Sequence, residues 1–274
     1  MTKTIWTPNP RTLVGMIHLA PLPGTPRAAA GPDEIVARAR REAALLIDAG
    51  FDAVLVENMH DTPYLRRDVG PEIVATMTCA TRAVTEVAQD RARVGVQILA
   101  GANRAALAVA LAAGADFIRA EGFAYAAVAD EGILEEADAG PLLRYRRAIG
   151  AEHVAVWTDV RKKHSAHALT DDLELHDLVA GHAFMGAEAM IVTGPHTGTA
   201  VSAHDLKVAS KASPCPVVVG SGATPERLEG LFEHADAVIV GSALKEDGDW
   251  RRDLCPTRIQ DFIVARDGSD SRSS

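Results

Sequence analysis

The sequence predicts a single (β/α)8 barrel, a TIM barrel of the phosphate-binding kind. Short β-branched apolar runs alternate with helix-length segments along the whole chain. Eight such runs fit within the 274 residues, a length typical of one barrel of this kind. Glycine-rich turns follow the last two runs, where such barrels often hold phosphate. An open doubly wound sheet is the alternative, but its usual GxGxxG turn after the first strand is absent.

Four of the expected strands share one kind of junction: a helix end, a small residue or glycine, an acidic residue and a β-branched run. These junctions lie at 48–58, 112–122, 185–194 and 234–242. The other four strands are expected at 13–19, 93–99, 153–160 and 215–221. Short, almost continuously apolar runs are typical of parallel strands, because both faces of a parallel sheet are buried.

Helices are expected between the strands. The clearest covers 32–50 and has one apolar stripe, formed by Ile35, Ala39, Ala43, Leu46 and Ile47. Pro32 marks its start and Gly50 its end. Further helices are expected at 71–90, 103–113, 139–149, 172–186, 202–212 and 225–233.

Composition bounds the domain organisation and the partners. No linker rich in Pro, Gly or Ser interrupts the alternation, so residues 1–265 are expected to form one domain, followed by a disordered polar tail at 266–274. The net charge of −9 argues against a nucleic-acid partner. No apolar run has the length of a signal peptide or a membrane span, which predicts no membrane insertion. The three scattered cysteines suit a reducing compartment, and we expect a cytoplasmic protein.

Polar residues stand at the C-terminal ends of the expected strands, where barrels of this kind have their active sites. In chain order they are His18, Glu57, Asn58, Gln97, Glu121, Asp159, Thr193, Ser221 and Ser242. A charged group at the end of a buried strand is costly unless it is paired or used. Glu57 and Glu121 are therefore candidates for the site, and an ion pair with Arg119 or Arg66 is the structural alternative.

Two glycine turns predict an anion site. The turn after the seventh strand contains Gly220, Ser221 and Gly222, and the turn after the eighth contains Gly241 and Ser242. Glycines allow backbone N–H groups to approach a phosphate, and a helix start behind the turn favours negative charge. A third glycine-containing loop begins at Thr193 and Gly194. Either turn alone could be a plain tight turn, but two in these positions favour phosphate binding.

The segment DVRKKHSAHALT, residues 159–170, concentrates charge directly after the fifth strand. Asp159, Lys163 and His164 are expected to form the polar floor of the site. His167 and Thr170 are expected to cap a helix that starts near residue 171.

No spacing typical of metal ligands is present. His176 and His182 lie six positions apart, whereas two ligands on one helix face are usually about four apart. HxH and HExxH motifs are absent. A barrel mouth could bring His18, Glu57 and His164 together, but we expect no metal and no cofactor.

Six segments together resemble the BtpA family, and more closely its SgcQ-like branch: MIHLAPLPGTP, VENMHDTPY, DVRKKHSAHALT, VTGPHTGTA, VVGSGATPE and VGSALKEDGDW. The resemblance extends from about Leu13 to about Ile263. It implies a phosphate-binding barrel similar to phosphoribosylanthranilate isomerase. Members of the family are linked to photosystem I assembly in cyanobacteria, and the SgcQ-like branch is described as a nucleosidase or a sugar-metabolism enzyme.

The resemblance also implies a set of motif residues, which are His18, Glu57, Asn58, Asp159, Lys163, His164, Gly220, Ser221, Gly222, Gly241 and Ser242. Met59 and His60 stand where a small or aromatic residue followed by glycine is expected, so the second loop departs from the family pattern.

The leading hypothesis for function is an enzyme that acts on a phosphorylated sugar or a ribosyl or nucleoside compound by acid–base chemistry. The expected catalytic residues are Glu57, Glu121, Asp159, Lys163 and His164. The expected residues that bind substrate or phosphate are His18, Asn58, Gln97, Thr193, Gly194, Gly220, Ser221, Gly222, Gly241 and Ser242.

Two alternatives stay open. A desolvated Lys163 could form a Schiff base and carry aldolase chemistry. The barrel could also be a non-catalytic assembly or stabilising factor, as the link to photosystem biogenesis implies. A phosphorylated small molecule is the expected partner, and a homo-oligomer is expected because such barrels commonly associate.

Overall fold

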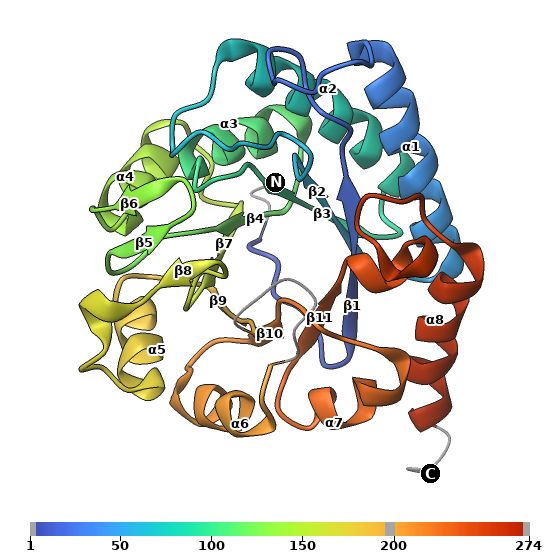
Figure 1. Cartoon of the computed structure of the whole chain (residues 1–274). Helices are drawn as coiled ribbons and strands as arrows, with labels where there is room; N and C mark the ends of the chain where they lie inside the picture. The colour runs from blue at the N-terminus through green and yellow to red at the C-terminus, as the bar shows by residue number, and fades with distance from the viewer. Residues whose placement is uncertain (1–3, 195–200, 271–274) are drawn as a thin grey trace.

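The computed structural model describes residues 4–194 and 201–270. Eight parallel strands close into a barrel in the order β1-β11-β10-β9-β7-β4-β3-β2, and helices surround it (Figure 1). The strands are β1 Thr12–His18, β2 Ala53–Glu57, β3 Arg93–Gln97, β4 Phe117–Ala120, β7 Ala155–Asp159, β9 Ala189–Val192, β10 Val217–Val219 and β11 Ala237–Val240. The predicted (β/α)8 barrel is confirmed.

Helices follow the barrel strands as the alternation predicts. They are α1 Pro32–Ala49, α2 Pro71–Ala88, α3 Asn103–Ala113, α4 Ala139–Ala148, α5 Leu175–Phe184, α6 Ala203–Ala212, α7 Leu228–Phe232 and α8 Pro256–Asp270. Gly50 ends α1 with a φ of 109°, a conformation that glycine adopts without steric cost. Since α8 runs to Asp270, the chain stays helical for five residues beyond the expected boundary at 265.

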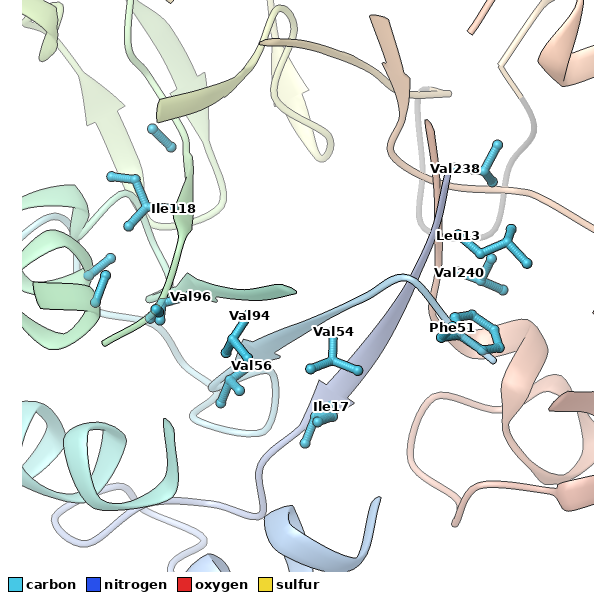
Figure 2. Close-up of a cluster of buried hydrophobic side chains, with 14 of the residues drawn as sticks. Leu13, Ile17, Phe51, Val54, Val56, Val94, Val96, Ile118, Val238 and Val240 are labelled. Carbon is cyan, nitrogen blue, oxygen red and sulfur yellow. The ribbon is translucent and has the colours of Figure 1, made fainter. Parts of the chain in front are cut away.

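Alternation along each strand divides the apolar side chains between two cores. Leu13 and Ile17 of β1 point to the helices and pack with Val54 and Val56 of β2 (Figure 2). Val14 belongs to a second cluster inside the barrel. This period of two gives His18 and Glu57 the same inward direction as the interior cluster, and the register pairs them directly.

Aromatic rings fill the N-terminal end of the barrel interior. Phe117 and Trp157 stack with ring centroids 4.1 Å apart, and Trp6 from the N-terminal segment lies 5.2 Å from Trp157. Gly95 makes room for this stack, because a Cβ there would lie 2.3 Å from the Phe117 ring. The interior is therefore packed below the polar strand ends, which face the opposite end of the barrel.

A small antiparallel sheet was not predicted. It consists of β5 Ala127–Ala129, β6 Gly132–Leu134 and β8 Ser165–Ala166, in the order β6-β5-β8. It joins the loop after β4 to the segment that follows β7 (Figure 1). Part of the charge-rich segment 159–170 is thus held by strand pairing.

The expected capping of a helix near residue 171 was wrong. Residues 168–170 form one 3₁₀ turn, in which the Thr170 hydroxyl donates to the His167 carbonyl over 3.2 Å. The helix α5 begins at Leu175 instead, because Glu174 and Asp177 satisfy its first N–H groups as a reciprocal capping box.

In the described part of the chain, every helix is too short or too polar to span a bilayer.

Candidate active site at the barrel mouth

A cavity of about 480 Å³ opens at the C-terminal ends of the barrel strands. Most of the predicted site residues line it, namely His18, Glu57, Gln97, Glu121, Lys163, His164, Gly220, Ser221, Gly222, Gly241 and Ser242. Asn58, Asp159, Thr193 and Gly194 are not part of this lining. One pocket therefore collects residues from seven of the eight strand ends, all except that of β9.

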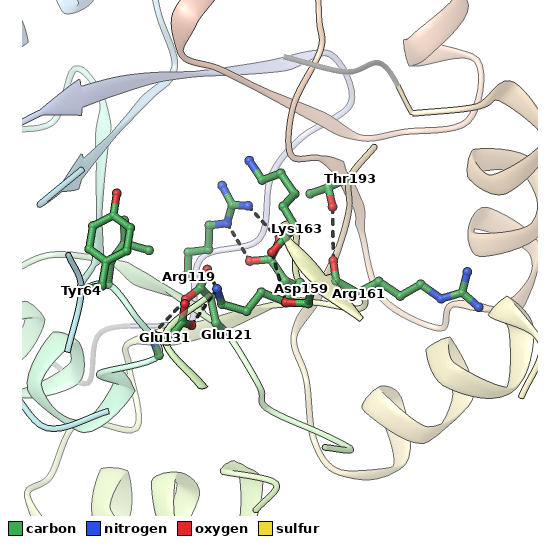
Figure 3. Close-up of polar contacts among 12 residues, drawn as sticks. Tyr64, Arg119, Glu121, Glu131, Asp159, Arg161, Lys163 and Thr193 are labelled. Carbon is green, nitrogen blue, oxygen red and sulfur yellow. Dashed lines mark hydrogen bonds and ion pairs between the residues drawn. The ribbon is translucent and has the colours of Figure 1, made fainter. Parts of the chain in front are cut away.

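Arg119 of β4, which lines the cavity, forms a buried ion pair with Asp159 of β7. Arg119 donates from Nε and Nη2 to the two carboxylate oxygens of Asp159, each over 2.8 Å (Figure 3). Both side chains are almost fully buried. Such a bidentate pair holds both partners rigidly. Asp159 thus fixes Arg119, which itself lines the cavity.

Glu57 is a buried carboxyl in the centre of the site. Burial raises its pKa to about 7, and the negative charges of Glu121 and Asp159 act in the same direction. The positive charges of Arg119 and Lys163 oppose this rise without cancelling it. At neutral pH Glu57 is therefore close to half protonated and can both give and take a proton.

His18 lies beside Glu57, with its Nε2 atom 3.5 Å from Oε2 of the carboxyl. Burial lowers the pKa of His18 to about 3, helped by the positive charge of Lys245. The imidazole is therefore neutral at physiological pH, and its contact with Glu57 is not a charge pair. Lys245 is itself completely buried and pairs with Glu42 over 3.2 Å.

Glu121 is held at the cavity wall by the backbone. One oxygen of its carboxylate accepts the Gly101 N–H over 2.9 Å. The other oxygen lies 3.9 Å from Lys162 Nζ, and burial raises the pKa of the carboxyl. Lys162 contacts Glu131 more closely, over 2.8 Å. Since Glu131 lies in the turn between β5 and β6, this ion pair ties the small sheet to the barrel mouth (Figure 3).

Lys163 differs from its neighbour Lys162. Its Nζ forms no hydrogen bond or ion pair with residues 4–194 and 201–270. Burial lowers the pKa of its amine, and the nearby Arg119 lowers it further. His164 follows with a φ of 53°, and it lines the same cavity.

The glycine turns after β10 and β11 are tightly packed. A Cβ at Gly220 would lie 2.5 Å from Ile191 Cγ2, and one at Gly241 would lie 3.3 Å from Met16 Cγ. Gly222 has a φ of 72°, which strains any other residue. The backbone of these turns therefore comes close to the cavity without side chains in between.

Sequence reasoning missed Arg258, which α8 adds to the cavity lining beside these turns. Its side chain is exposed and forms no ion pair with the described residues. Its place in the first turn of a helix after the last strand was the available signal.

Three predicted binding residues lie elsewhere. Asn58 is buried beside the mouth, where it accepts the Leu99 N–H over 2.7 Å and donates to Asp61 over 2.9 Å. Thr193 and Gly194 line a second cavity of about 700 Å³, which His164 lines as well. The Thr193 hydroxyl donates to the Arg161 carbonyl (Figure 3). Residues 195–200, the rest of that glycine-rich loop, lie outside the described residues.

The second loop, which departs from the family pattern, contributes apolar and aromatic surface. Met59 lines the mouth cavity, and its carbonyl accepts the Tyr64 hydroxyl over 2.7 Å. The His60 ring packs on Trp250 with centroids 4.9 Å apart, and burial lowers its pKa to about 4. Within residues 4–194 and 201–270, no three His, Cys, Asp or Glu side chains are grouped to hold a metal ion.

Solved structures share the architecture. (S)-3-O-geranylgeranylglyceryl phosphate synthase from Thermoplasma acidophilum superposes with a TM-score of 0.59 and 16% identity, over 94% of this chain and 93% of that one. Phosphoribosyl anthranilate isomerase from Thermus thermophilus superposes with a TM-score of 0.57 and 16% identity, over 94% and 98%. At this identity the similarity shows the fold alone.

Relatives by sequence cover nearly the whole chain. A mitochondrial uncharacterized protein of Caenorhabditis elegans is 44% identical over 252 residues, which is 91% of this chain and 90% of that protein. Photosystem I biogenesis protein BtpA of Synechocystis sp. is 34% identical over 265 residues, which is 96% and 90%. The BtpA family model matches residues 9–267, and the chain belongs to the BtpA family.

Proposed function

We propose that this protein is an enzyme that acts on a phosphorylated sugar or ribosyl compound at the barrel mouth. One observation carries the proposal: a carboxyl with its pKa raised to about 7 shares a cavity with two glycine turns that can approach an anion. Structural neighbours support the substrate class, since one is described in complex with sn-glycerol-1-phosphate. A pocket that combines a titratable group with convergent polar groups is typical of an active site.

The phosphate end of the substrate would rest on the turns after β10 and β11. The residues proposed to bind it are Gly220, Ser221, Gly222, Gly241 and Ser242, joined by Arg258. Backbone N–H groups at close-packed glycines suit an anion because they add no side-chain bulk. An arginine at the edge of the turns adds a charged donor.

The reacting end would lie between Glu57 and Lys163. Glu57 is proposed to transfer the proton, because its pKa lies close to the working pH. Arg119, fixed by Asp159, would stabilise negative charge that develops on a substrate oxygen. Glu121, His164, His18 and Gln97 complete the polar walls.

A thermal-shift screen with phosphorylated sugars, nucleosides and nucleotides tests the substrate class, with inorganic phosphate as the control. Ligand at about 100 times its dissociation constant stabilises the folded state by about 2.7 kcal/mol. The proposal predicts a selective rise in Tm with one phosphorylated compound, and turnover of that compound that Glu57→Gln abolishes. If no compound in the screen, inorganic phosphate included, raised the Tm, the proposed anion site would be wrong.

A non-catalytic assembly factor is the second candidate, because the Synechocystis relative is named a photosystem I biogenesis protein. A scaffold has no need for a half-buried lysine that forms no ion pair within residues 4–194 and 201–270 and that shares a cavity with a titrating carboxyl. Complementation of a deletion strain distinguishes the two candidates. If the Glu57→Gln and Lys163→Met variants each restored every phenotype of the deletion, the protein would act as a scaffold and not as an enzyme.

We also propose a location and an assembly state. The three cysteines are free, which suits a reducing compartment such as the cytoplasm. The Caenorhabditis elegans relative carries a mitochondrial name, so fractionation decides between the two. A homo-oligomer is proposed because barrels of this kind commonly associate, and sedimentation velocity tests it.

A further inference from the structure

We infer that Lys163 is a nucleophile that forms an imine with the carbonyl carbon of a phosphorylated aldehyde or ketone. This inference rests on the proposed function, and it names the bond that the site makes. It selects a phosphorylated carbonyl compound as the substrate, reacting in its open-chain form.

Two adjacent lysines provide the first observation. Lys162 is ion-paired, with Nζ 2.8 Å from Glu131 and 3.9 Å from Glu121. Lys163 reaches into the mouth cavity, and its Nζ has no such partner among residues 4–194 and 201–270. Lys162 thus has a structural role as an ion-paired cation, whereas the amine of Lys163 can contact a ligand.

The second observation is the engagement of Asp159. This carboxylate is the acidic group closest to Lys163 in sequence, but both of its oxygens accept hydrogen bonds from Arg119 over 2.8 Å. Figure 3 shows Lys163 extended beside the Arg119–Asp159 pair. Asp159 is thus engaged by Arg119, and the Arg119 guanidinium adds a positive charge near Lys163.

These surroundings increase the share of neutral amine. Burial and the nearby Arg119 lower the pKa of Lys163, and the charges of Asp159, Glu57 and Glu121 oppose this fall without cancelling it. Below the pKa, each unit of lowering raises the neutral fraction about tenfold. Only the neutral amine has the lone pair that attacks a carbonyl.

In the proposed step, the Lys163 amine and the substrate carbonyl condense to a protonated imine and water. The Nζ lone pair attacks the carbonyl carbon, the C=O π electrons move to oxygen, and a proton passes from nitrogen to oxygen to give a carbinolamine. Protonation of the hydroxyl by Glu57 then expels water and forms the protonated imine. The imine next withdraws electrons from the neighbouring carbon, which permits C–C cleavage or removal of an α-proton. Glu57 can supply and recover the proton because its pKa is raised to about 7.

Reductive trapping tests the inference with two probes that differ only in the phosphate, D-glyceraldehyde 3-phosphate and D-glyceraldehyde. Sodium cyanoborohydride delivers hydride to the imine carbon and fixes the adduct as a secondary amine. Peptide mapping by mass spectrometry then locates the adduct in the folded wild-type protein. Exposed Lys207 and Lys211 serve as internal controls, and Lys162→Arg is the matched control for Lys163→Arg.

We expect Lys163 to be labelled at least about tenfold faster than Lys207 and Lys211 near neutral pH. The phosphorylated probe should label it faster than glyceraldehyde. Lys163→Arg should remove this adduct, and Lys162→Arg should retain it. Labelling of Lys163 no faster than that of the surface lysines in the wild type overturns the imine, whether or not either variant folds.

The two probes separate this inference from the proposed function. If both probes label Lys163 fast and at equal rates, the imine is supported and the proposed phosphate site is contradicted. The phosphorylated probe can also be tested for a rise in Tm without cyanoborohydride. If the Tm rises but Lys163 is not labelled in the trapping experiment, the phosphate site is supported and the imine is contradicted.

Discussion

Glu57 is a carboxylic acid whose surroundings hold it near half protonation at neutral pH. Its pKa is higher in the folded protein than in the unfolded chain, so the folded state binds more protons between the two values. The free energy of unfolding therefore falls as the pH rises from about 4.5 to about 7, and the loss persists above that range. The carboxylate is tolerated at a cost in stability, as expected for a functional group.

Glu57→Gln should stabilise the protein at alkaline pH because it removes this buried charge. We expect a gain of at most about 3 kcal/mol at about pH 8, and little or no gain at about pH 4. Urea denaturation at the two pH values measures it. A gain that does not change with pH would show that Glu57 is not the titrating group.

Asp159→Asn should destabilise the fold by about 3–5 kcal/mol, because it leaves the buried Arg119 charge without its counterion. Glu86→Gln is the matched control, since the Arg40–Glu86 pair is about half exposed and its loss should cost less than about 1 kcal/mol. If Asp159→Asn and Glu86→Gln lowered the urea midpoint equally, the Arg119–Asp159 pair would not stabilise the fold more than an exposed pair.

At the level of residues, the period of two decides which of the predicted residues face the cavity. Glu57, Gln97 and Glu121 were predicted from the strand ends, and all three line the cavity. Asn58 follows Glu57 by one position and therefore points away from the cavity, toward Asp61 and Leu99. Arg119 was considered only as a structural partner, because a basic residue inside an apolar strand gives no sign of which carboxylate it will meet.

At the level of elements, the glycine turns decide how closely the backbone approaches a ligand. Gly220→Ala would place a Cβ 2.5 Å from Ile191 Cγ2 and 2.6 Å from Thr193 Cγ2. We expect a loss of about 1–3 kcal/mol in stability, together with weaker binding of phosphorylated ligands, because the turn must shift.

Gly230→Ala provides the control for this substitution. Gly230 lies in α7, and a Cβ there meets nothing within 4 Å. Alanine is favoured over glycine in a helix by about 0.5–1 kcal/mol, so this variant should keep or gain stability. Thermal denaturation of both variants measures the difference, and equal Tm values would argue against close packing at Gly220.

The helix α8 supplies Arg258 to the same turns. Arg258→Ala should weaken binding of a phosphorylated ligand about tenfold or more, since a hydrogen bond to a charged group contributes about 1.5–3 kcal/mol. Arg252→Ala, which removes an exposed arginine outside the cavity lining, should leave affinity unchanged. Calorimetric titration distinguishes them, and equal affinities would place the phosphate away from α8.

The barrel elements could be predicted because buried parallel strands and capped helices leave strong local patterns. The sheet of β5, β6 and β8 could not, since its strands are two or three residues long and Val128 and Ile133 on them are exposed. Its ion pair between Glu131 and Lys162 joins residues from separate loops, a contact that only the closed barrel creates.

At the level of the whole molecule, closure of the barrel turns scattered strand ends into one site. The rings of Trp6, Phe117 and Trp157 close the N-terminal end. The polar groups are therefore left at the other end, where the long loops and the small sheet gather. The proposed anion site is compatible with an acidic chain, because Arg258 and the glycine turns lie together at the mouth.

The most direct test of the central claim is a crystal structure with bound ribose 5-phosphate. We expect the phosphate on the turns formed by residues 220–222 and 241–243, with the sugar carbonyl end between Glu57 and Lys163. A phosphate in the second cavity beside Thr193, with the barrel mouth empty, would contradict it.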